Sequence, residues 1–208
     1  MAARKSSRTR KASPDGNELL VLELQEIHSA ESQLSRILPK LMKSVDSKEL
    51  RGCLEERLSQ GERLTKEVES ALEEMNESPG RKKNVAAEGL INDAREHVQE
   101  LESGPALDAV LIGAIQKTEH YCIGAWGTAR SLGAGAGEKQ VVKSMERALE
   151  EGKQMDEQLT QLAEQKINPQ VFGAESVEDT EEDEEEGSAR GRSGRRGNPG
   201  RQEQRTPR

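Results

Sequence analysis

Aromatic residues are almost absent from this sequence. Its 208 residues include one tyrosine, one tryptophan and one phenylalanine, so any core must be built from aliphatic side chains, which suit interdigitated helices. The two cysteines, Cys53 and Cys122, form no regular framework, which argues against a disulfide scaffold. No leader pattern opens the chain, and no apolar run nears the roughly 20 residues that span a bilayer. We therefore expect an all-α, cytoplasmic protein without membrane contact.

The familiar nucleotide and nucleophile motifs are also missing. The sequence contains no G-x-x-x-x-G-K-[ST] loop, no G-x-G-x-x-G after a predicted strand, no G-x-S-x-G elbow and no C-x-x-C pair. The glycine-rich segment GAGAGE, residues 133–138, joins two predicted helices and lacks the strand and lysine that phosphate binding requires. It is interpreted as a loop.

Charge is abundant but unevenly distributed. The net charge of -8 combines +4 in residues 1–15, -9 in residues 175–186 and +6 in residues 187–208, which leaves -9 for the rest. The terminal segments lack the apolar content that would offset the entropy of ordering, so we expect them to be disordered. The predicted organisation is a basic arm at 1–15, a helical bundle at 16–170, and an acidic block followed by an Arg/Gly-rich tail at 171–208.

Apolar residues recur with helical spacing through the body of the chain. Pro39 is the one discordant residue in the first stripe, and the helix is expected to bend there. Four long helices, each roughly 40 Å at about 1.5 Å per residue, can hide their stripes by forming a four-helix bundle, with a short extra helix between the second and third. The predicted helices are about 16–45, 47–76, 85–102, 106–133 and 138–166, the last closed by Asn168-Pro169.

Each long helix interrupts its apolar stripe near its midpoint with polar or very small residues. Because helices of similar length lie side by side, these interruptions are expected to meet at one level inside the bundle. An unpaired buried carboxylate costs several kcal/mol, so such a level requires a cation, a donor network or a metal. The interrupting residues are Glu31, Arg57 with Gly61, Glu119, and Gly152 with Asp156, and two histidines, His28 and His120, lie beside them.

Two interpretations follow for this polar level. Dimetal helical bundles hold two iron or manganese ions with one Glu from each of two helices and a Glu-x-x-His from each of the others, and Glu31 and Glu119 are placed like the single glutamates. The other interpretation is a structural layer in which Arg57 pairs with Glu31, Glu119 or Asp156. The metal interpretation includes a reduced site completed by His28 or His120.

Several segments resemble the YciE/YciF group of bacterial ferritin-like proteins, which are associated with stress and labelled ferroxidase-like. The resemblance covers about residues 18–165 and rests on LELQEIHSAESQL, on ALEEMNESPGRKKN followed by AEGLI, and on ALDAVLIGAIQKTEHYCIGAWGTARSL followed by ALEEGKQMDEQLTQLAE. It implies a ferritin-like four-helix bundle, a homodimer and a carboxylate-rich dimetal centre.

The sequence departs from the pattern of that group at four of the ligand positions that the resemblance implies. Where the group usually has His, Glu, Glu and Glu, this chain has Arg57, Gln60, Cys122 and Gly152. The expected function is therefore a stress-associated ferritin-like protein whose di-iron site is partly or wholly lost. The alternative is a carboxylate metalloprotein that binds and oxidises Fe(II) through Glu31, Glu119, Asp156, His28 and His120.

The basic arms allow a third function. Several arginines and lysines at both ends can neutralise phosphates, so non-specific, salt-dependent nucleic-acid binding is a further hypothesis. No aromatic residue is interleaved with them to provide a stacking surface. The acidic block beside the carboxyl-terminal arm would compete for the same arginines.

Overall fold

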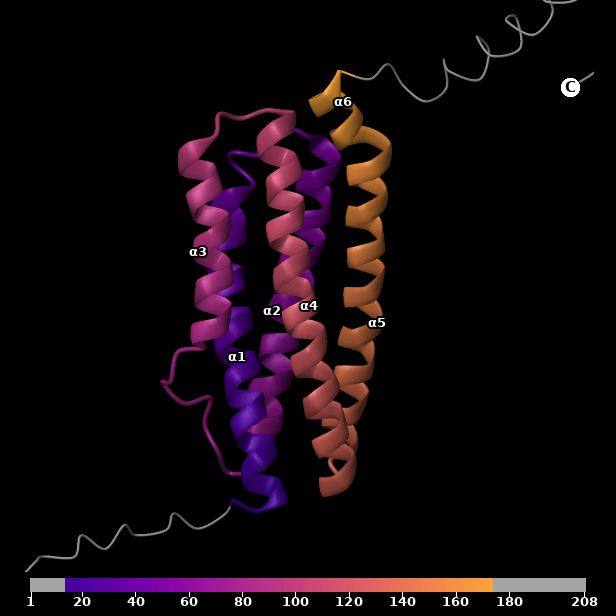
Figure 1. Cartoon of the computed structure of the whole chain (residues 1–208). Coiled ribbons are helices and arrows are strands. Elements are labelled where there is room, and N and C mark those ends of the chain that lie inside the picture. Colours follow the sequence, from indigo (N-terminus) through magenta and orange to yellow (C-terminus); the bar gives the residue numbers. More distant parts are fainter. Residues whose placement is uncertain (1–13, 174–208) are drawn as a thin grey trace, which may run out of the picture. The chain divides into compact units, whose positions relative to one another are not determined.

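In the described part of the chain, four long helices form a bundle and a fifth, shorter helix lies against one side. The structure, a computed structural model, describes residues 14–173 (Figure 1). The helices of the bundle are α1 (Gly16–Leu41), α2 (Lys48–Glu74), α4 (Pro105–Ala136) and α5 (Lys139–Leu162). No strand occurs in this part of the chain, so the all-α prediction and the helical bundle are confirmed. The predicted basic arm and acidic tail lie outside the described residues except at 14–15, where Asp15 caps the first helix, and at 171–173, where the last helix continues to Phe172.

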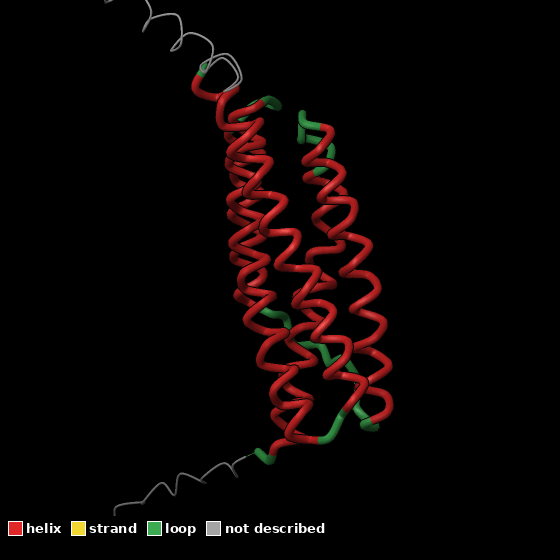
Figure 2. The backbone as a smooth tube through the Cα atoms, turned by 90° about the vertical axis from the view of Figure 1, so that its right-hand side faces the viewer, coloured by secondary structure: helices red, strands yellow, loops and turns green. Residues whose placement is uncertain are grey.

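The shorter helix α3 (Val85–Glu100) packs against α1 and α4 on the outside of the four-helix core. In Figure 1, the loop after α2 runs along α1 for part of the length of the bundle before α3 begins, so α3 is shorter than the four helices of the bundle. Figure 2 shows the other connections at the helix ends. Within residues 14–173, no helix combines the length and apolarity needed to cross a membrane.

Local sequence explains most of the helix boundaries. Asp15 accepts the backbone N–H of Glu18, whose carboxylate in turn accepts the N–H of Asp15, which makes a capping box for α1. The hydroxyl of Ser47 caps α2 by accepting the N–H of Leu50. Gly137 ends α4 with φ of 80°, a left-handed conformation that glycine adopts without strain.

Three predicted helix ends need correction. α1 runs through Pro39 and ends at Leu41, although the apolar repeat continues to Val45. α4 runs through the glycines at 133 and 135, because a helix packed along its length tolerates their weak helix propensity. Asn168-Pro169 does not end the helical region, because a π-helical turn (Ala163–Ile167) leads directly into α6 (Asn168–Phe172). Proline is accepted there because it stands in the first turn of α6.

A buried aspartate holds the loop between α1 and α2. Asp108, in the first turn of α4, is 1% exposed and accepts the backbone N–H groups of Asp46 and Ser47 at 3.1 and 2.7 Å. It was not among the residues predicted from the sequence. Its contacts fix the start of α2 relative to α4, and therefore the level at which the polar residues of these helices meet.

Candidate functional site

Arg57 lies at the centre of the bundle and connects three helices. From α2, its Nη1 and Nη2 donate to the two carboxylate oxygens of Glu31 on α1, both at 3.0 Å. Its Nε donates to Oε2 of Glu119 on α4 at 2.6 Å. We call these three residues the arginine network. Their exposed fractions are 2%, 0% and 1%, so the ion pairs lie in the dry interior.

Two side chains of α4 complete the surroundings of the guanidinium. The Trp126 ring lies under Arg57, with the guanidinium carbon 5.5 Å from the ring centroid, a cation–π arrangement. Nη2 also lies 3.7 Å from the sulfur of Cys122, which is buried. Burial raises the pKa of the Cys122 thiol well above its ordinary value, so this sulfur is a neutral, weak acceptor and not a thiolate ligand.

Two glycines leave the room that the arginine network occupies. A β-carbon built at Gly61 would lie 2.8 Å from Oε2 of Glu31 and 2.9 Å from Nη1 of Arg57. One built at Gly152, on α5, would lie 2.6 Å from Cζ3 of Trp126 and 2.9 Å from Oε1 of Glu119. Neither position accepts a side chain unless these groups move.

The charges of the arginine network do not balance when both carboxylates are ionised. Oε1 of Glu119 is buried and has no hydrogen-bond partner. Burial raises the pKa of Glu119, and the neighbouring Arg57 opposes this rise without cancelling it. Burial alone would lower the pKa of Arg57, but the charges of Glu31 and Glu119 outweigh it and raise that pKa well above the ordinary value. The network thus holds a permanent cation, and Glu119 takes up a proton more readily than an exposed glutamate.

Asp156, predicted to join this polar level, does not pair with Arg57. Its carboxylate pairs with Nε2 of His120 at 3.0 Å and accepts from Nε2 of Gln116 at 3.1 Å, on the outer side of the α4–α5 contact. The His120 side chain is 67% exposed. Met155, and not Asp156, continues the buried stripe of α5 through Gly152, so the Asp156 carboxylate is turned out of the buried face. A shift of one residue turns a side chain by about 100° around a helix.

His28 is also directed away from the arginine network. Its Nε2 lies 2.8 Å from Oε1 of Glu69, at the boundary of α1 and α2. The five predicted metal ligands therefore fall into three places. Within residues 14–173, no three His, Cys, Asp or Glu side chains come close enough together to hold a metal ion.

The donor set at the centre of the bundle does not fit a dimetal site. Two carboxylates are present there, where about four with additional histidines are typical, and each already binds the guanidinium. A divalent ion placed between them would meet the charge of Arg57 at short range. Sequence reasoning missed Trp126 as a member of this site, because a single tryptophan on an apolar face is indistinguishable from ordinary core.

Comparisons with known proteins agree with this architecture. Residues 15–171 match the protein family described as Domain of unknown function (DUF892). The chain is 40% identical over 149 residues to Protein YciF of Escherichia coli strain K12, an alignment that covers 70% of this chain and 88% of that protein.

Two solved structures share the fold. The crystal structure of the E. coli stress protein YciF matches with a TM-score of 0.71 and 33% identity, over 75% of this chain and 99% of that one. YcfI from Rhodopseudomonas palustris matches with a TM-score of 0.67, over 73% of this chain and 97% of that one, but at 24% identity it supports the fold alone.

Proposed function

Since this chain belongs to the DUF892 family and is similar to a bacterial stress protein, we propose that it is a stress-associated bundle protein whose centre holds an ion network in place of a dimetal site. One observation carries the proposal: the guanidinium of Arg57 binds both central carboxylates, Glu31 and Glu119. The side chains that a metal would need as ligands are used to neutralise a permanent cation.

The role of the network in this proposal is structural. Arg57 ties α2 to α1 through a paired contact and to α4 through a single one. A buried ion pair adds little net stability compared with well-packed apolar residues, but it penalises any sliding of one helix along another. The arginine network therefore specifies helix register.

The metal content of the purified full-length chain tests this proposal. Cells are grown with added iron and manganese, and bound metal per chain is measured for the natural protein and for Glu119→Gln. We expect far less than one metal per chain, with no difference between the two proteins. A surface control, His120→Ala, identifies metal held adventitiously by the exposed pair of His120 and Asp156.

The competing function is the oxidation of Fe(II) by a carboxylate metal site. One or more metal ions per chain, lost in both Glu31→Gln and Glu119→Gln but retained in His120→Ala, would establish a metal centre at the arginine network and reject the proposal. The homodimer that the resemblance implies is measured on the same samples by light scattering, and we expect a mass of two chains.

A further inference from the structure

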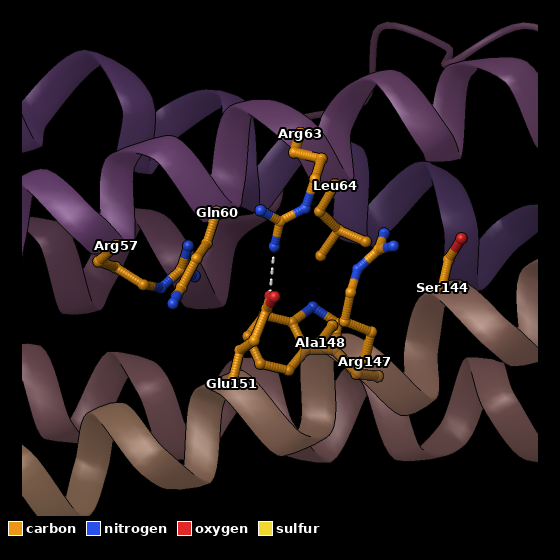
Figure 3. Close-up of a pocket in the computed structure, with 9 residues that line it drawn as sticks. Arg57, Gln60, Arg63, Leu64, Ser144, Arg147, Ala148 and Glu151 are labelled. Atoms are coloured by element: carbon orange, nitrogen blue, oxygen red, sulfur yellow. Dashed lines mark hydrogen bonds and ion pairs between the residues drawn. The ribbon is translucent and has the colours of Figure 1, made fainter.

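A small cavity lies next to the arginine network, between α2, α4 and α5. Figure 3 shows Arg57, Gln60 and Arg63 on one helix facing Ser144, Arg147 and Glu151 on the other, and Trp126 lines the same cavity. Its volume is about 10 Å³, measured as the room available to the centre of a water-sized sphere. A single ordered water needs roughly this volume, so the cavity has room for one water-sized molecule.

One buried donor in the wall of this cavity has no partner. Nε1 of Trp126 is a hydrogen-bond donor only, its side chain is 3% exposed, and no acceptor of residues 14–173 reaches it. Buried indole N–H groups normally find a partner, since leaving one unpaired carries the full cost of desolvation. The arrangement points to an occupant that accepts a hydrogen bond.

The surrounding charges decide which kind of occupant fits. Three guanidinium groups line the cavity, which at first favours an anion. Each is already matched, however: Arg63 pairs with Glu151, Arg147 pairs with Glu67, and Arg57 binds two carboxylates. Three cations are thus matched by four carboxylates, so no excess positive charge is left to offset the desolvation of an anion.

We propose that the cavity beside Trp126 and Arg57 is a binding site for one small neutral hydrogen-bonding molecule, with water as its resident. The water accepts the N–H of Trp126 and donates to lining oxygen atoms, for which Ser144, Gln60 and Glu151 are available. This inference concerns the α2–α5 side of the arginine network and holds whether or not a metal binds at its carboxylates.

Proton NMR on the ¹⁵N-labelled full-length chain tests the site directly. The chain has one tryptophan, so its indole N–H gives a single resonance that needs no further assignment. We expect a cross-peak between this N–H and water whose sign differs between NOE and ROE spectra, as direct contact with a long-lived water produces. A cross-peak that arises from chemical exchange through the Ser144 hydroxyl has the same sign in the NOE and ROE spectra. Because Ser144→Ala removes this hydroxyl, we expect the variant to retain the peak from direct contact with water.

Two results would overturn the proposal. Absence of the contact cross-peak in the natural chain would mean that the cavity holds no resident water. A saturable shift of the indole resonance on titration with chloride, at constant ionic strength kept with fluoride, would assign the cavity to a monatomic anion. As a matched variant, Ala148→Val places methyl groups in the cavity and is expected to abolish the cross-peak; if it does not fold, the peak in the natural chain decides alone.

Discussion

Arg57 and Glu31 face each other edge to edge, with Nη1 and Nη2 each 3.0 Å from one carboxylate oxygen. This geometry uses the planar fork of arginine, and no other basic side chain reproduces it. Because both groups are buried, removing one leaves the other charged and unpaired, which is far more costly than the net contribution of the intact pair suggests.

Arg57→Met should therefore destabilise the bundle strongly. It leaves Glu31 and Glu119 facing each other without a cation, and we expect a loss of about 3–5 kcal/mol in the free energy of unfolding, measured with urea. The control is Arg63→Met on the same helix, whose half-exposed pair with Glu151 should contribute less than about 1 kcal/mol. Equal losses of unfolding free energy in the two variants would show that the buried pairing of Arg57 contributes no more than the exposed pairing of Arg63.

The two glutamates should respond differently to the same neutral replacement. Both oxygens of Glu31 accept from Arg57, and Glu31→Gln replaces one of them with an amide NH₂. This donor would face an N–H donor of Arg57, so we expect a loss of about 3 kcal/mol in the free energy of unfolding. Glu119 uses only one oxygen on Arg57. Glu119→Gln keeps that acceptor and balances the charges of the network, so its cost should stay within about 1 kcal/mol. The reverse order of costs would contradict the described geometry.

Glu119 should also make stability depend on pH with a negative slope. Burial raises its folded pKa above the ordinary value of 4.5, although Arg57 opposes this; Glu31 and Asp156 also favour the proton. Between 4.5 and the raised value the folded state binds more protons, so unfolding free energy falls as pH rises, by at most about 1.4 kcal/mol per unit. Below 4.5 both states are protonated and this dependence vanishes.

The difference in unfolding free energy between the natural chain and Glu119→Gln isolates this group. We expect the natural chain to lose stability relative to Glu119→Gln as pH rises from 4.5 toward neutrality. A shift in its favour over the same range would mean that the pairing with Arg57 lowers the pKa of Glu119, and that burial is the weaker influence.

The arginine network was partly predictable from sequence, and the reasons for success and failure are physical. Glu31, Arg57 and Glu119 interrupt stripes made of large aliphatic residues, so their inward direction is unambiguous. On α5 the buried stripe runs through Ala148 and Gly152, residues too small to mark a face, while Leu149 lies only partly buried beside it. That ambiguity misplaced Asp156. The space left by the glycines and the position of the Trp126 ring under Arg57 could not be predicted. Both depend on packing between helices, and the apolar stripe of one helix carries no information about it.

Gly152 tests that packing. Gly152→Ala would place its β-carbon against Cζ3 of Trp126 and Oε1 of Glu119, and we expect a loss of about 1–3 kcal/mol. Gly124→Ala is the matched control, since that position is exposed on α4 with nothing within 4 Å of the added carbon. Alanine has a higher helix propensity than glycine, so Gly124→Ala should stabilise the chain by up to about 1 kcal/mol. Two variants of equal stability would refute the close approach at Gly152.

Asn84 holds the short helix onto the bundle. Its Oδ1 caps α3 by accepting the N–H of Ala87 at 3.0 Å, while its Nδ2 donates to the carbonyl of Glu26 at 3.1 Å and to the hydroxyl of Tyr121 at 2.5 Å. Asn84 is 1% exposed, so its replacement leaves these partners buried without a substitute. The side chain therefore joins the start of α3 to both α1 and α4.

Asn84→Ala should loosen α3 selectively. Losing the cap and two buried hydrogen bonds should cost about 2 kcal/mol. Native-state hydrogen exchange should show the amides of α3 exchanging well before those of α1, α2, α4 and α5, because α3 packs on the outside of the four-helix core. The control Asn92→Ala, on the exposed side of α3, should leave the order of exchange unchanged. Uniform acceleration in all helices would mean that α3 unfolds only with the whole bundle.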